Sequence, residues 1–307
     1  MSATPPTTGA TPHQHAVPAA IVLYAPDALL LDRLLAALDR DRRRLILFAN
    51  GPLAPAVALR LKQLSNAIVL GAPVNLGHGE GLNAVVRQAM AEGFSHVLLL
   101  DQDSEPAPDL PERLRARLAA EAGDIAAIGP LLVPPPGEGY RAIRYQWRDA
   151  RHGAALFLPT SGTLLALDAF ARIGEFRADY FIGGIDVEWG LRADHAGYRL
   201  LVARDVAMPH RWGTPAEAGS HAVPQILRHT ASRNYYYIRN AIACLRLPHA
   251  RPGWKLHYGA NLVLQIVRLL AARRFDRPTR ALVASAIGDG FAGRLGPAEA
   301  GKIDAAS

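Results

Sequence analysis

The sequence predicts an α/β fold, in which a mostly parallel, twisted sheet is flanked by helices and followed by a helical, basic C-terminal extension. Three observations support this prediction. Short apolar runs alternate with helical periodicities from Ala19 onward. Half of the 307 residues are hydrophobic, which is enough for a sizeable core and excludes wholesale disorder. Positive charge gathers near the C-terminus, where nine Lys/Arg and one acid lie between Arg239 and Arg280.

The first half of the chain gives the clearest strand and helix patterns. Apolar runs predict strands over residues 20–24, 44–49, 67–71, 96–100 and 125–133. Helical periodicity predicts helices over residues 29–39, 54–64 and from the glycine-rich stretch 75–83 to residue 92. Asp109 and Glu112 have the spacing of a capping box, which predicts a helix over residues 109–121.

The second half is less regular. Residues 134–160 are rich in Pro, Gly and Arg, and we expect them to form an irregular loop. Further strands are expected at 161–167 and 198–203, and helices at 168–173 and 186–196. The chain therefore divides into a disordered tail (1–18), an α/β domain (19–223) and a helical basic region (224–307).

An amphipathic helix is predicted between Trp254 and Arg274. A narrow polar stripe is formed at helical spacing by His257, Asn261, Gln265 and Arg268, and leucine, valine and isoleucine fill the rest of the surface. Such a helix can lie in an anionic membrane interface or pack as a core or dimer helix. We therefore expect contact with a membrane surface. Formation of an oligomer through this helix is an open alternative. The chain contains no run of 18 apolar residues, so no membrane span is predicted.

The cysteine content and the N-terminal residues indicate the cellular compartment in which the protein is expected. Cys244 is the single cysteine, so the chain can form neither an internal disulfide nor a metal site built on thiolates. This usage agrees with a reducing compartment. The first residues have neither the basic nor the apolar region of a secretory signal. We therefore expect a cytoplasmic protein, with peripheral binding to the inner face of the cell membrane.

Two acids, Asp101 and Asp103, follow directly after the apolar run 96–100. Ligands of open α/β sheets bind outside the carboxyl ends of the strands, so both carboxylates are expected at a binding edge. Carboxylate oxygens suit Mg²⁺ or Mn²⁺ that bridges a diphosphate. The alternative is that Asp103 or Ser104 caps a turn before Pro106.

A series of short motifs over residues 20–213 has a specific order and spacing. The motifs are Tyr24-Ala-Pro26-Asp27, Asn50-Gly51, Asn75-Leu76-Gly77, Asn83, Leu100-Asp101-Gln102-Asp103-Ser104, Ser161-Gly162, Asp186-Val187-Glu188-Trp189, Ala196-Gly197-Tyr198-Arg199 and His210. By these motifs the chain resembles the family 2 glycosyltransferases with the A-type, Rossmann-like nucleotide-sugar-binding fold. Among them it is similar to the rhamnosyltransferase-like members.

The resemblance implies an inverting, metal-dependent glycosyltransferase. It would move a sugar, L-rhamnose from dTDP-L-rhamnose, to a hydroxyl of a glycan or lipid-linked acceptor in cell-surface polysaccharide biosynthesis. Asp186 would be the catalytic base, and Asp101, Asp103 and His210 would hold Mg²⁺ or Mn²⁺. The donor would contact Tyr24, Asn50, Asn75, Gly77, Asn83, Asp101, Gln102 and Asp103. The acceptor side would include Ser161, Gly162, Glu188 and Trp189.

Several of these residue types also have plain structural interpretations. A sugar hydroxyl that attacks an anomeric carbon must lose a proton, and a carboxylate such as Asp186 can accept it. However, an Asp that opens a helix is also a favoured N-cap. Trp189 can pack beneath the acceptor site instead of touching a sugar, and His210 can be structural. Arg233 and Arg239 can face a diphosphate or a lipid-linked acceptor, or pack a helix on the sheet.

The chain departs from the family pattern at two positions. The family usually has an acid before Asn-Gly at the end of the second strand, where this chain has Ala49. The family usually has Asn before Pro in the first motif, where this chain has Ala25. These departures leave the base of the donor nucleotide open.

Four alternative functions compete with the prediction of a rhamnosyltransferase. Another hexosyltransferase or a galactofuranosyltransferase of the same fold would share the motifs. An aspartate-dependent phosphatase would use the first Asp as nucleophile, but an obvious lysine partner is lacking. A dehydrogenase is disfavoured because glycines 77, 79 and 81 have the wrong spacing for a dinucleotide fingerprint. A non-enzymatic module that binds membranes or nucleic acid could use the basic segment, although we expect no nucleic acid because Lys/Arg do not extend through the α/β body.

Overall fold

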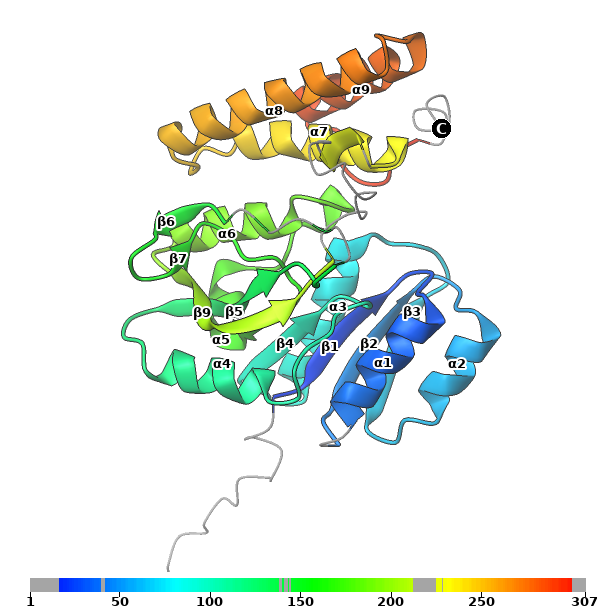
Figure 1. The fold of residues 1–307 in the computed structure, drawn as a ribbon, viewed down its shortest axis with the longest axis vertical. Coiled ribbons are helices and arrows are strands. Elements are labelled where there is room, and N and C mark those ends of the chain that lie inside the picture. Colours follow the sequence, from blue (N-terminus) through cyan, green and yellow to red (C-terminus); the bar gives the residue numbers. More distant parts are fainter. Residues whose placement is uncertain are drawn as a thin grey trace, which may run out of the picture.

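A twisted sheet forms the centre of the protein in the computed structural model, which describes residues 17–39, 42–137, 140, 143, 145–211, 225–227 and 229–299 (Figure 1). Its strands are β1 (Ala19–Leu23), β2 (Leu45–Asn50), β3 (Ala67–Ala72), β4 (His96–Leu100), β5 (Ile125–Val133), β6 (Trp147–Asp149), β7 (Ala154–Ala155), β8 (Thr163–Ala166) and β9 (Arg199–Pro209). Their order is β3-β2-β1-β4-β8-β5-β9-β7-β6. The predicted α/β fold is confirmed.

The sheet is mixed in direction. β3, β2, β1 and β4 are paired in parallel, and β5 pairs in parallel with β9. β8 lies between β4 and β5 and is antiparallel to both. The parallel strands therefore share one direction, and their carboxyl ends meet at one edge of the sheet.

Helices cover both faces because side chains alternate along each strand. One face carries α1 (Ala28–Asp39), α2 (Pro55–Lys62) and α4 (Leu110–Ala119), and the other carries α3 (His78–Ala91), α5 (Leu167–Ile173) and α6 (Ile185–His195). Ile21 and Leu47 pack under α1, whose buried leucines recur at helical spacing. Val22 and Phe48, the next residues along, pack under α3. Two cores thus sandwich the sheet.

The structure corrects three details of the predicted elements. Residues 134–160 are not wholly irregular, because β6 and β7 form a short antiparallel pair against β9. β9 runs on to Pro209 across a shift in register with β5, beyond the predicted end at residue 203. α4 forms as predicted, but the capping box does not. Asp109 makes no side-chain cap hydrogen bond, and Glu112 instead pairs with Arg43 at 3.0 Å.

The C-terminal region is helical as expected. α7 (Ala231–Leu245), α8 (Pro252–Ala272) and α9 (Arg277–Ala292) pack around a third apolar core and lie above the sheet in Figure 1. Among the described residues, no helix is long and apolar enough to cross a membrane. The expected domain boundary at 223/224 and residues 1–16 of the expected tail lie outside the described residues. Val17 is already buried in the core.

Candidate active site

The first motifs meet at the carboxyl edge of the sheet, as the parallel strand direction requires. Tyr24 follows β1, Asn50 ends β2, and Asp101 follows β4. The side chain of Gln102 joins two of these ends. Its Oε1 accepts a hydrogen bond from the Tyr24 amide at 2.9 Å, and its Nε2 donates to the Tyr24 carbonyl at 3.1 Å. Gln102 therefore fixes the acidic loop against β1, whereas the Tyr24 ring remains 57% exposed.

The carboxylates of Asp101 and Asp103 lie close enough to repel each other. Burial raises the pKa of Asp103, and the charge of Asp101 raises it further. His210 and Arg211 act in the opposite direction on the same carboxyl, so all four residues are grouped. Thr160 Oγ1 lies 3.5 Å from Asp101 Oδ1. Two repelling carboxylates at a strand edge form a site that gains stability from a bound cation.

Ser161 and Gly162 support the acidic loop from behind and do not face an acceptor. Ser161 is 1% exposed, and its hydroxyl lies 2.7 Å from that of Ser104. Gly162 has a φ of 80°, and its amide donates to the Leu99 carbonyl at 2.8 Å. A Cβ at Gly162 would lie 2.9 Å from Met208 Cε. This corrects the acceptor-side assignment of both residues.

Asp186 lies in the first turn of α6, which begins after Gly184. It is not the N-cap, since Gly184 occupies that position in a left-handed conformation. Asp186 Oδ1 accepts a hydrogen bond from the amide of Val187 at 2.9 Å. Burial nevertheless dominates and raises the pKa of Asp186 to about 6, with a smaller contribution in the same direction from Asp101. A carboxylate with this pKa is suited to act as a base near neutral pH.

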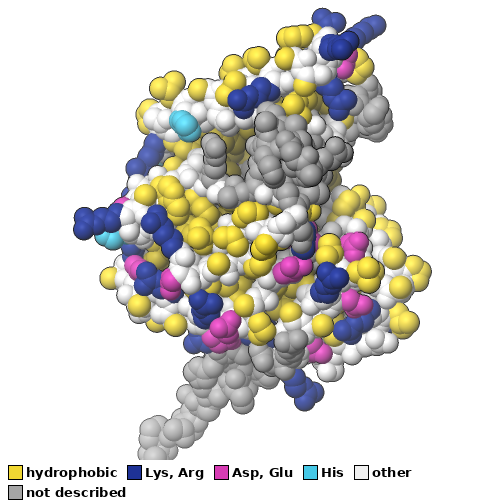
Figure 2. All heavy atoms as spheres, in the orientation of Figure 1, with side chains coloured by type: hydrophobic (Ala, Val, Ile, Leu, Met, Phe, Trp, Pro, Cys, Tyr) yellow, Lys and Arg dark blue, Asp and Glu magenta, His cyan; other side chains and the backbone are white. Residues whose placement is uncertain are grey.

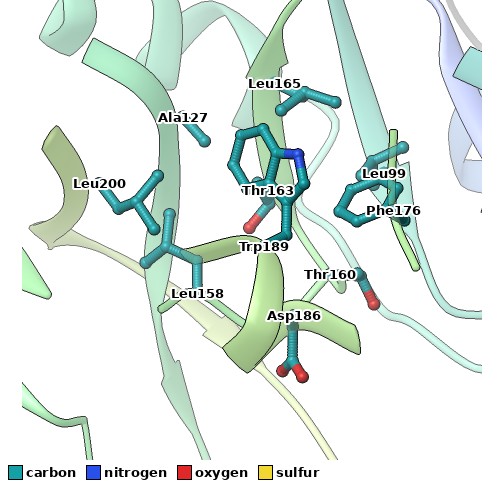
Figure 3. A pocket seen from close by; sticks show the side chains of 10 residues that line it. All are labelled: Leu99, Ala127, Leu158, Thr160, Thr163, Leu165, Phe176, Asp186, Trp189 and Leu200. Carbon is teal, nitrogen blue, oxygen red and sulfur yellow. The ribbon is translucent and has the colours of Figure 1, made fainter. Parts of the chain in front are cut away.

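A small apolar cavity lies behind Asp186 (Figure 3). It is lined by Leu99, Ala127, Leu158, Thr160, Thr163, Leu165, Phe176, Asp186, Trp189 and Leu200. Its volume of about 20 Å³ has room for about one water, so it cannot hold a sugar. In Figure 3 the Asp186 carboxylate points away from the cavity and from the indole of Trp189. The cavity wall therefore lies behind Asp186, and its carboxylate faces the other side.

Glu188 and Trp189 face the protein interior, which corrects their acceptor-side assignment. Glu188 is 1% exposed and accepts two hydrogen bonds from Arg192, at 2.8 and 2.9 Å. The indole of Trp189 donates to the Gly174 carbonyl at 2.9 Å and packs against the rings of Phe170 and Phe176. One turn of α6 thus directs Asp186 outward and these two residues inward.

Asn50 and Asn75 order the loop before α3. The Asn50 side chain donates to Asn75 Oδ1 at 2.9 Å and to the Gly77 carbonyl at 3.1 Å, and it accepts from the Leu76 amide at 2.8 Å. Asn75 Oδ1 also accepts from the Gly77 amide at 2.8 Å. Asn50 is 3% exposed, so we assign it to the loop itself and not to direct donor contact.

Gly77 and Gly81 allow close packing at the start of α3, and Asn83 forms buried hydrogen bonds. A Cβ at Gly77 would lie 2.8 Å from the Phe181 ring, and one at Gly81 would lie 2.6 Å from Val22. Asn83 is 1% exposed and pairs its amide with both backbone groups of Phe176 at 2.9 Å. The structure therefore corrects the donor-binding assignment of Asn83, which instead joins α3 to the segment after α5.

Two basic residues join the acidic group from other parts of the chain. His78 opens α3, and its amide donates to the Phe181 carbonyl at 2.6 Å. Burial lowers the pKa of His78, while the charges of Asp101 and Arg233 act on it in opposite directions. Arg233 lies in the first turn of α7. No strand-end motif indicates His78, whereas Arg233 is one of the two arginines expected either to face a diphosphate or lipid-linked acceptor or to pack a helix on the sheet.

The segment before Asp186 is held by α7. Phe181 has a φ of 63° and a ψ of −64°, which is a strained conformation for a residue with a Cβ, whereas Gly183 and Gly184 adopt their positive φ of 80° and 74° without strain. Asn240 Nδ2 donates to three carbonyls of the turn, those of Tyr180, Ile182 and Gly183, at 2.9, 3.0 and 2.7 Å. The guanidinium of Arg239 is fully buried and donates to Tyr180 at 3.1 Å and to Gly296 at 2.6 Å. The C-terminal helices therefore fix the turn from which Asp186 projects, and Arg239 faces no ligand.

The side chains around Asp101 and Asp103 are suited to a divalent cation that also binds oxygens of a diphosphate. The described residues contain no cluster of three or more His, Cys, Asp or Glu that could hold a metal alone. Mg²⁺ usually binds one or two carboxylates together with substrate phosphates and waters. The repelling pair Asp101 and Asp103 fits that pattern. His210 acts on Asp103 electrostatically but does not complete a three-ligand group.

Ala25 adopts a backbone conformation that asparagine favours more than alanine does. It has a φ of 42°, in the left-handed region that Asn adopts more readily than alanine. Ala49 lies on β2 opposite Gly71, and nothing in the structure explains the absence of an acid there.

A mixed sheet with acidic residues at its carboxyl edge is the arrangement expected of the A-type nucleotide-sugar-binding fold. The chain is similar to the dTDP-rhamnosyl transferase RfbF of Shigella flexneri, with 25% identity over 246 residues, which cover 75% of this chain and 80% of that protein. No family model matches the sequence. These findings confirm the rhamnosyltransferase-like resemblance.

Solved structures show the same fold. S. aureus TarS 1–349 in complex with UDP-GlcNAc superposes with a TM-score of 0.59 at 14% identity, over 90% of this chain and 80% of that one. GalNAc-T7 with UDP, GalNAc and Mn²⁺ superposes with a TM-score of 0.52 at 14% identity, over 81% of this chain and 55% of that one. The A-type glycosyltransferase fold is therefore confirmed.

Proposed function

We propose that the protein is an inverting glycosyltransferase that transfers L-rhamnose from dTDP-L-rhamnose to a hydroxyl of a glycan or lipid-linked acceptor in cell-surface polysaccharide biosynthesis. The observation that carries the proposal is the position of Asp186. Its carboxylate has a raised pKa and projects from a clamped turn, within electrostatic reach of Asp101 at the strand edge. The similarity to a dTDP-rhamnosyl transferase supports the choice of donor.

In the proposed reaction, Asp186 is the general base. The acceptor hydroxyl attacks the anomeric carbon, its proton passes to Asp186 Oδ, and the bond from that carbon to the diphosphate oxygen breaks. A single displacement of this kind inverts the anomeric configuration. A positioned base contributes on the order of 10²- to 10⁴-fold to such a step.

The departing diphosphate carries negative charge, and the basic residues near the acidic pair are placed to offset it. Arg233 approaches from α7, and His210 and Arg211 approach from the end of β9. We assign Arg233 to direct contact with the diphosphate, because a guanidinium binds phosphate oxygens with paired hydrogen bonds. A bound Mg²⁺ or Mn²⁺ held by Asp101 and Asp103 would neutralise the leaving group. His210 is near enough to act on the Asp103 carboxyl, and we propose that it would become a further ligand only when the metal is bound.

The nucleotide base is assigned to the open edge beside β1 and β2. The exposed ring of Tyr24 can stack on it, and Asn75 borders the same edge from the loop before α3. Gly77 shapes this loop through its positive φ. Since Ala49 offers no carboxylate, thymine must be recognised through other groups.

The pH dependence of turnover tests the base. Because the pKa of Asp186 is raised to about 6, its ionised form predominates only above that pH. We expect kcat/KM to rise about tenfold for each pH unit below about 6 and to level off above it. The measurement is dTDP release from dTDP-L-rhamnose between about pH 4.5 and 8, at saturating metal and acceptor. A profile that is flat down to about pH 5 would contradict the assignment of Asp186.

A further inference from the structure

The outward face of α8 is apolar and uncovered by the described residues. Along the helix, Leu256, Val263 and Val267 are 78%, 61% and 52% exposed. They belong to a stripe of exposed apolar residues at spacings of three and four, which consists of Leu256, Ala260, Val263, Leu264, Val267 and Ala271. Phe275, just beyond the end of α8, is also exposed. The opposite side of the helix is buried through Trp254, Leu262 and Leu269. A stripe of this length is unusual on a surface that meets only water.

Basic residues flank the stripe. Arg268 is exposed on α8, and Arg273, Arg274 and Arg277 follow at the turn into α9. The sequence contains no Asp or Glu between residues 218 and 275. Asp276 is the nearest acid along the chain, and its side chain caps α9 by accepting a hydrogen bond from the Thr279 amide. Figure 2 shows hydrophobic and basic side chains side by side over α8 and α9.

We infer that this face, the α8 stripe with its basic flank, docks the protein flat on an anionic lipid surface. An amphipathic helix with Lys/Arg at its borders inserts its apolar side below the headgroups, while the cations meet the anionic lipids. α8 has 21 residues and is therefore about 30 Å long, so it provides an extended contact.

Charge favours lipid over a second copy of the chain. A twofold dimer through this stripe would set the same patch against itself. If the two copies of α8 ran parallel, Arg268, Arg273 and Arg274 of both copies would lie close together. If they ran antiparallel, these arginines would lie near Lys255 of the other copy. Neither arrangement supplies an acid of the patch to compensate them. Phosphate groups of an anionic bilayer supply the missing negative charge.

The position of the stripe suits an acceptor held in the membrane. α7 to α9 lie beyond the sheet edge that carries Asp101, and α7 supplies both Arg233 and the clamp on the Asp186 turn (Figure 1). Docking through α8 would bring the reacting edge toward the lipid surface. The α8 stripe is separate from the proposed catalytic residues, so its binding to lipid can be measured without the sugar donor and without an activity assay.

Vesicle sedimentation of the full chain tests the inference. We expect binding to phosphatidylcholine vesicles that contain about 30% phosphatidylglycerol, and much weaker binding to pure phosphatidylcholine or at high salt. L256S/V263S removes part of the stripe, and R268Q/R274Q removes part of the flank. Each double variant should lower the vesicle partition coefficient by about tenfold or more.

The matched control is L29S/L59S, which removes equally exposed residues from α1 and α2. It should bind vesicles like the wild type, and unchanged thermal unfolding shows that each variant is folded. Absence of wild-type binding to anionic vesicles would overturn the inference, as would an equal loss in the control. A wild-type dimer that L256S/V263S dissociates in analytical ultracentrifugation, without vesicle binding, would assign the stripe to a second copy.

Discussion

Replacing Asp186 with asparagine is expected to lower kcat by about 10³-fold while leaving donor affinity nearly unchanged. Asparagine has a similar shape, and its Oδ1 can still accept the hydrogen bond from the Val187 amide. It cannot accept the proton of the acceptor hydroxyl. The measurements are kcat for dTDP release and calorimetric donor affinity, made on the same preparation.

The same variant should be more stable than the wild type at neutral pH. The pKa of Asp186 is raised to about 6 in the folded protein, above its ordinary value of 3.8, so folding disfavours the ionised form. This cost is absent below the unfolded-state pKa, grows as pH rises toward 6, and is complete above it. D186N should therefore gain about 2 kcal/mol of unfolding free energy near pH 8 and nothing near pH 3.

Glu188 provides a matched control two residues away. E188Q breaks a buried ion pair with Arg192, so it should lose about 2–4 kcal/mol of stability while the folded protein keeps most of its kcat. D186N should therefore lose activity and gain stability, whereas E188Q should keep activity and lose stability. If E188Q were inactive and D186N active, Glu188 and not Asp186 would be the base.

Replacing Asn240 with alanine is expected to lower kcat by about 10- to 100-fold, with a smaller change in donor KM. The variant removes three hydrogen bonds from the strained turn before Asp186. Relaxation of that turn would displace the carboxylate, and catalysis is sensitive to displacements of about 1 Å. Stability should fall by about 2–4 kcal/mol, because buried carbonyls lose their donor. Kinetics and urea unfolding measure the two effects.

N66A is the control for Asn240. Asn66 Nδ2 likewise donates to a backbone carbonyl, that of Arg43, at 2.7 Å, but it lies beside the amino ends of β2 and β3. It should lose stability and keep its kcat. Equal kcat losses in N66A and N240A would show that general destabilisation, and not the position of Asp186, explains the effect.

The fold was predictable where local signals agree with tertiary packing. The apolar runs of β1 to β5 and the leucines of α1 are long enough to define period and boundaries. The β6 and β7 pair was missed because strands of three and two residues have no measurable period. The capping box at Asp109 failed because Glu112 pairs with Arg43, which is distant in sequence.

The site was predictable at the strand ends and less so elsewhere. The position of Asp101 at the sheet edge follows from the strand that precedes it. The burial of Asp186, in contrast, could not be predicted from its place at the start of a helix. Ser161, Asn83 and Trp189 belong to motifs near the site, yet each supports it from inside. Sequence spacing cannot separate a residue that touches a ligand from one that holds its neighbour. His78 and Asn240 come from elements whose packing on the site only the tertiary structure reveals.

Calorimetric titration of the donor tests the central claim most directly. The wild type and Asp103→Ala are titrated with dTDP-L-rhamnose, UDP-galactose, UDP-glucose and GDP-mannose, with and without Mn²⁺. We expect metal-dependent binding of dTDP-L-rhamnose to the wild type, and its loss in Asp103→Ala, because the remaining carboxylate cannot hold the cation alone. Metal-independent binding of equal strength to both proteins, or binding of none of the four donors, would contradict the account.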